Sequence, residues 1–65
     1  MEYTNSQARE AIAEFIHSSR DRIVLEKRLI DGLTYEKIAE DMGMSVRQIK
    51  NIVYKSEDIL FRKMH

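Results

Sequence analysis

The chain has 65 residues, enough for one domain with one small core, and it contains no cysteine, which excludes disulfide bonds and thiolate metal sites. Eleven basic and eleven acidic side chains give a formal net charge of zero, and no apolar stretch approaches the roughly 20 residues that cross a bilayer. With no proline and two glycines, the composition predicts an all-α fold, a small four-helix domain over 1–65. The N-terminus has no signal-peptide pattern, so we expect a cytoplasmic location and no membrane contact.

The first predicted helix covers residues 6–17. Thr4 and Gln7 have the spacing of a capping box, in which each side chain bonds the backbone N–H of the other residue. Apolar residues then recur at helical spacing and predict one buried face: Ala8, Ile12, Phe15 and Ile16. His17 ends this helix in the prediction.

The second predicted helix covers residues 20–31. Ser18 and Ser19 separate it from the first helix, and Asp21 places negative charge in its first turn, where the helix dipole is positive. Its predicted buried face consists of Val24, Leu25 and Leu29, with Ile30 as a further candidate. Gly32 ends the helix in this prediction.

The third predicted helix covers residues 35–42. The Thr34 hydroxyl can cap its first turn, and Glu36 adds negative charge there. Its apolar stripe is narrow: Ile38, Ala39 and Met42. Ala39 is small, so we expect the next helix to approach closest at this point. Gly43 ends the helix where a left-handed backbone is needed, and Met44 can pack back over the turn.

The fourth predicted helix covers residues 46–62, and Ser45 with Gln48 has the spacing of a second capping box. At 100° per residue the helix divides into two faces. The apolar side, expected in the core, comprises Ile49, Ile52, Val53, Ser56 and Leu60. The opposite side is polar and comprises Arg47, Lys50, Asn51 and Tyr54.

A helix, a glycine turn and a second helix over residues 34–56 have the layout of a helix-turn-helix, which places its second helix in the major groove of DNA. The pattern therefore predicts binding to double-stranded DNA. The candidate contact residues are Thr34, Ser45, Val46, Arg47, Gln48, Lys50, Asn51, Tyr54 and Lys55. The alternative is that the basic residues only keep an amphipathic helix soluble, as most charged faces do; the turn and the spacing favour the helix-turn-helix.

Several segments match one family pattern in order and without a gap: Arg22-Ile23-Val24-Leu25, Leu29, Asp31-Gly32-Leu33-Thr34, Ile38-Ala39-Glu40, Gly43-Met44-Ser45, Ile49 and Ile52. On these residues the stretch from Arg20 to Lys63 resembles the fourth conserved region of bacterial sigma factors, which reads a promoter element. It is also similar to the helix-turn-helix of quorum-type response regulators. The resemblance implies contacts to base edges and phosphates from the first turns of the last helix: Val46, Arg47, Gln48, Lys50 and Asn51.

Charge is unevenly distributed along the chain. Residues 1–44 hold six basic and nine acidic side chains (−3), whereas residues 45–65 hold five basic and two acidic side chains (+3). Between Ser45 and Ser56 there are three basic residues and no acid, and the last helix has fewer arginines than is usual in the family. So few cations neutralise few phosphates. We therefore expect specific binding to need a second copy, in a homodimer, or a protein partner such as RNA polymerase.

Phe61 falls on the polar side of the fourth predicted helix, beside Tyr54. Two interpretations stay open: Phe61 is an oligomer contact, or it packs back against the first helix. The sequence also leaves a rival function open, a sigma-like module that docks on RNA polymerase or another regulator without reading DNA. The zero net charge and Phe61 favour that rival, and the polar run 47–51 favours DNA.

Residues that could support catalysis are few. The predicted solvent side of the third helix carries three acidic residues: Glu36, Glu40 and Asp41. A solvated face is a simpler interpretation of them than a metal site or an acid–base site. His17 is predicted at a helix C-terminus and His65 is the last residue, and neither sits beside a likely nucleophile. The chain has no glycine-rich phosphate loop and no metal-ligand spacing. We therefore expect no enzymatic activity, no metal and no cofactor.

Overall fold

A computed structural model describes residues 4–63, and within this range the chain is helical, with short connections and no strand. The elements are α1 (Asn5–Phe15), α2 (Ser19–Leu25), the π-helical turn η1 (Glu26–Ile30) that continues α2 directly, α3 (Tyr35–Met42) and α4 (Val46–Lys63). The all-α prediction is confirmed. With α2 and η1 taken together as the second helix, each predicted helix lies within two residues of an observed one at both ends. None of the described helices has the length and apolarity needed to cross a bilayer. His65 lies outside the described residues.

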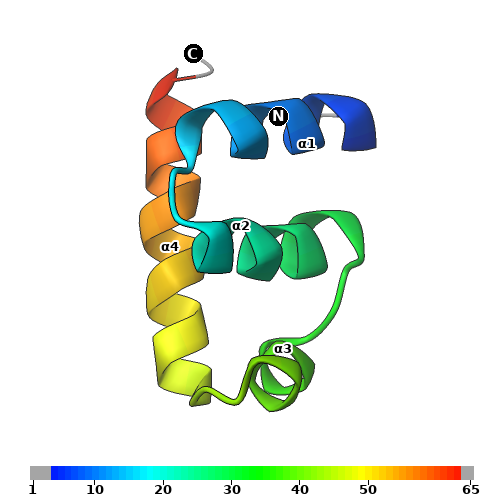
Figure 1. Ribbon diagram of the computed structural model, residues 1–65, viewed down its shortest axis with the longest axis vertical. Helices are drawn as coiled ribbons and strands as arrows, with labels where there is room; N and C mark the ends of the chain where they lie inside the picture. The colour runs from blue at the N-terminus through cyan, green and yellow to red at the C-terminus, as the bar shows by residue number, and fades with distance from the viewer. Residues whose placement is uncertain (1–3, 64–65) are drawn as a thin grey trace.

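The longest helix, α4, is the element against which the others pack (Figure 1). Along its length, α1 packs near its C-terminal end, α2 packs beside its middle, and α3 lies at its N-terminal end. This arrangement brings α3 and the first turns of α4 together at one end of the domain, with α1 at the other end.

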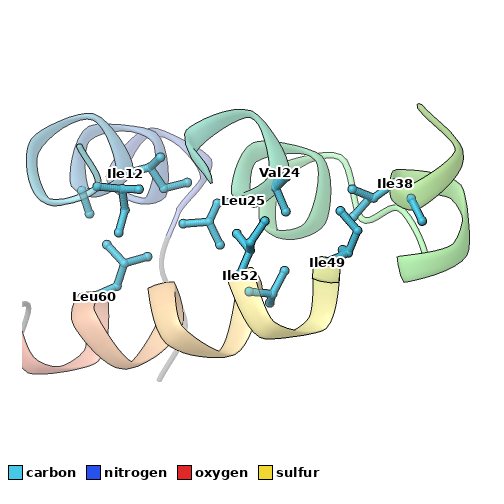
Figure 2. Packing of buried hydrophobic residues seen from close by; sticks show 11 residues of the cluster. Ile12, Val24, Leu25, Ile38, Ile49, Ile52 and Leu60 are labelled. Carbon is cyan, nitrogen blue, oxygen red and sulfur yellow. The ribbon is translucent and has the colours of Figure 1, made fainter. Parts of the chain in front are cut away.

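The core is a single apolar cluster between α4 and the three shorter helices. Figure 2 shows Ile49 of α4 beside Ile38 of α3, and Leu60 of α4 opposite Ile12 of α1. Every residue predicted on the apolar side of the fourth helix is buried: Ile49, Ile52, Val53, Ser56 and Leu60. The predicted register of the last helix is therefore confirmed, and it fixes which side chains of α4 face outward.

The capping box of α1 lies where the sequence predicted it, α2 has a cap at Ser18, and α1 ends earlier than predicted. Thr4 and Gln7 form the capping box, and the Ser18 hydroxyl accepts the N–H of Asp21 at 3.4 Å. The helix stops at Phe15 because Ile16 adopts an extended conformation (φ −105°, ψ 113°), which turns its side chain into the core. The Arg22 guanidinium donates to the Ile16 carbonyl. His17 therefore lies exposed in the connection, and the prediction that it ends the helix was wrong.

The predicted burial of Leu29 was also wrong, and the segment that contains it, η1, is π-helical. Its bonds span five residues, as from the N–H of Asp31 to the carbonyl of Glu26 at 3.0 Å. This wider turn brings Ile30, five residues after the buried Leu25, closer to the core side than α-helical spacing would. Ile30 packs against the core, and Leu29 is 38% exposed.

Candidate nucleic-acid interface

The turn between α3 and α4 is built on a left-handed Gly43 (φ 66°, ψ 34°). The N–H of Met44 donates to the carbonyl of Ala39 at 3.0 Å, and the N–H of Gly43 donates to the carbonyl of Glu40 at 3.4 Å, which is the Schellman pattern. A Cβ at Gly43 would meet no heavy atom within 4 Å, so the backbone conformation and not the available space selects glycine here. The turn thus fixes the direction in which the chain passes from α3 into α4.

Three of the predicted contact residues also cap helices. The Thr34 hydroxyl accepts the N–H of Lys37 at 3.1 Å, at the start of α3. At the start of α4, the Ser45 hydroxyl accepts the N–H of Gln48 at 3.1 Å, while Gln48 Oε1 accepts the N–H of Ser45 at 2.9 Å. The capping box predicted at this position is confirmed. Because its oxygen is occupied, Gln48 has its amide N–H groups left for an external partner.

The outward face of α4 presents the remaining candidates to solvent. Arg47, Lys50, Asn51, Tyr54 and Lys55 are all exposed, and Val46 is half-buried against the core. Among the residues that the structure describes, the three cations of this face form no ion pair with a carboxylate. Their charges are therefore available to an anionic partner such as a phosphate.

A cluster around the Tyr35 ring extends this face beyond α4. The Arg28 guanidinium carbon of η1 lies 4.4 Å from the ring centroid, and the Lys50 ammonium nitrogen of α4 lies 5.7 Å from it. The Tyr54 ring meets Tyr35 edge to face, with the centroids 6.3 Å apart and the planes at 80°. Three elements thus converge on one aromatic side chain at the start of α3.

A comparison with protein-family models places residues 18–57 in sigma-70, region 4, a match over more than half of the chain. The chain belongs to the sigma-70 region 4 family. The resemblance inferred from the sequence is thereby confirmed, and the match includes the whole helix-turn-helix and every candidate contact residue. Membership of this family indicates a DNA-binding or transcription-related role. It also indicates interaction with DNA and RNA polymerase. Searches among curated proteins and among solved structures gave no significant match.

Among the described residues, some charged side chains of this sigma-70 region 4 domain form ion pairs, and others are exposed without one. Asp41 of α3 accepts Lys27 of η1 at 3.7 Å and Lys37 at 3.3 Å, which ties η1 to α3 and neutralises charge there. Glu36 and Glu40 lie exposed on α3. The outer side of α3 is consequently acidic overall, and the cations of the helix-turn-helix that form no ion pair within residues 4–63 lie on α4.

Two residues of the cluster around the Tyr35 ring were not predicted from the sequence: Arg28 and Tyr35 itself. Their contacts join η1, α3 and α4, and no helical spacing relates residues on three separate elements. Arg28 also lies in the π-helical turn, where the α-helical projection fails. The only sequence signal was an aromatic residue at the first position of α3, next to the Thr34 cap.

Proposed function

We propose that the chain is a sequence-specific DNA-binding regulator of transcription, with the first turns of α4 in the major groove. The observation that supports this most is the face of α4 directly after the Gly43 turn, where Arg47, Lys50 and Asn51 are exposed opposite a fully packed apolar side. A helix-turn-helix uses this part of its second helix for base contacts. The role proposed is binding without catalysis.

Each side chain on this face has a chemical preference for part of the duplex. Arg47 can donate two hydrogen bonds to guanine O6 and N7, and Asn51 can pair with adenine N6 and N7. Lys50 and Lys55 can donate to phosphates, which positions the helix without reading sequence. The Gln48 amide N–H groups are further donors. The face thus has partners for both base edges and backbone.

The proposed functional unit is larger than one chain, either a homodimer on two half-sites or a complex with RNA polymerase. The three cations on the outward face of α4, Arg47, Lys50 and Lys55, would neutralise about three phosphates, which gives modest affinity at physiological salt. Two copies would double that number and would require half-sites about one helical turn apart. Phe61, 61% exposed near the C-terminal end of α4, is the residue we propose for the contact between copies.

The rival proposal is a protein-binding module that docks on RNA polymerase or another regulator and makes no contact with DNA. The small number of cations on α4 and the acidic outer side of α3 favour it. The two proposals differ in salt dependence. Binding to random duplex DNA should weaken steeply with salt for a DNA-binding protein, and a protein-only module should show almost no such binding.

The test is selection of bound sites from a random duplex library, followed by affinity measurements on the enriched sequence. Arg47→Ala should weaken binding to that sequence, and Arg9→Ala is the matched control. Arg9 is also an exposed arginine and belongs to α1, which lies at the far end of the domain from the start of α4 (Figure 1). Enrichment of no sequence, or equal losses in the two variants, would contradict specific reading by α4.

A further inference from the structure

The Tyr35 ring is held in place by its own element and by its neighbours. Tyr35 is the first residue of α3 and packs half-buried against the core, directly after the Thr34 cap. Arg28 lies over the ring and donates through Nη1 to the Leu33 carbonyl at 2.9 Å, so the guanidinium is anchored to the segment that leads into α3. The edge-to-face contact with Tyr54 restrains the ring from α4. The ring therefore has a defined position in the protein before any DNA binds.

Lys50 is the one member of the outward face of α4 whose charged group touches this ring. Its ammonium lies 5.7 Å from the ring centroid, within the range in which the negative face of an aromatic ring attracts a cation. A lysine has a flexible side chain, which loses rotamer freedom when it binds a fixed partner. The ring contact restricts that freedom in advance and leaves the ammonium N–H groups free to donate.

We propose that Tyr35 is a positioning residue for DNA binding: its ring holds the Lys50 ammonium on the side of α4 that meets the duplex. This inference rests on the proposed function. Tyr35 acts through Lys50 and not through a DNA contact of its own, and this distinction decides the experiment. The effect of changing Tyr35 must depend on whether Lys50 is present.

The experiment is a double-mutant cycle on affinity for the selected duplex, with Tyr35→Leu, Lys50→Ala and the double variant. Tyr35→Leu should weaken binding about two- to fivefold, the range expected for an exposed cation–aromatic contact. In the Lys50→Ala background the same change should have almost no further effect. Tyr35→Phe should bind like the parent, because the ring remains.

A second substitution keeps the test independent of folding. Pentafluorophenylalanine in place of Tyr35 retains a ring of similar size but no longer offers a negative face to a cation. Compared with Tyr35→Phe it should weaken binding only when Lys50 is present. Melting temperatures of all variants identify any loss that comes from unfolding.

The outcomes separate this inference from the proposed function. A parent protein that binds DNA, with equal losses on changing Tyr35 in both backgrounds, would overturn the positioning role alone and would indicate a direct contact or a structural effect. Equal affinity of the Tyr35→Phe and fluorinated proteins would also overturn it. A parent that binds no duplex at all would overturn the proposed function, and the positioning role with it.

Discussion

Replacing Ile49 with alanine should destabilise the domain strongly without touching the outward face of α4. Ile49 is fully buried in the first turn of α4 and lies beside Ile38 of α3 (Figure 2). The change removes the three side-chain carbons beyond Cβ, worth about 0.8 kcal/mol each in transfer free energy, and leaves a cavity between α3 and α4. The total loss should be about 2 to 5 kcal/mol. A domain of this size has about 3 to 10 kcal/mol of stability altogether.

Thermal and urea denaturation followed by circular dichroism would measure this loss. At about 4–8 °C per kcal/mol for a domain of this size, the melting temperature should fall by about 10 °C or more. The matched control is Ile23→Ala, the same change at a residue that is 47% exposed on α2, where we expect a loss below about 1 kcal/mol. Equal melting temperatures for the parent and Ile49→Ala would refute the assigned register of α4 and its packing on α3.

Three further predictions concern the outward face, the C-terminal end of α4 and the turn. Arg47→Ala and Asn51→Ala should each weaken binding to the selected duplex by about 1 to 3 kcal/mol in a competition assay, with the helical spectrum unchanged because both residues are exposed. Phe61→Glu should reduce self-association in sedimentation and weaken DNA binding together, while the monomer stays helical; a monomeric parent that binds tightly at one protein per site would rule out the homodimer. Gly43→Ala should lower the free energy of unfolding by about 1 to 2 kcal/mol through its positive φ alone, and an unchanged urea midpoint would show that the turn does not need this conformation.

The parts of the fold that depend on local spacing could be predicted from the sequence. Ser56 was placed in the core from helical spacing alone, and it is buried. Gly43 and the Ser45 cap were predicted because a positive φ and a capping box each restrict the amino acids at fixed positions. Such features depend on a few consecutive residues, so a single amino-acid sequence is enough to predict them.

The parts that depend on tertiary structure could not be predicted. The projection assumed α-helical spacing and placed Leu29 in the core, with Ile30 as a further candidate. In the π-helical turn Ile30 packs against the core and Leu29 is 38% exposed. The Tyr35 contacts with Arg28 and Lys50 bring together residues from separate elements, so no local pattern announces them. The contact residues of α4 and the role of Phe61 stay predictions, since they concern partners outside the chain.

The most direct test of the central claim is a salt titration of binding to a fluorescently labelled duplex carrying the selected site, read by anisotropy. If the three cations of the outward face of α4 contact phosphates, the logarithm of the binding constant should fall linearly with the logarithm of salt concentration. The slope should be near −3 for a monomer and about twice that for a dimer on two half-sites. Lys50→Ala should reduce its magnitude by about 0.9 per chain, while Arg9→Ala should leave it unchanged. Absence of binding at low salt, or a slope near zero, would contradict DNA recognition by α4.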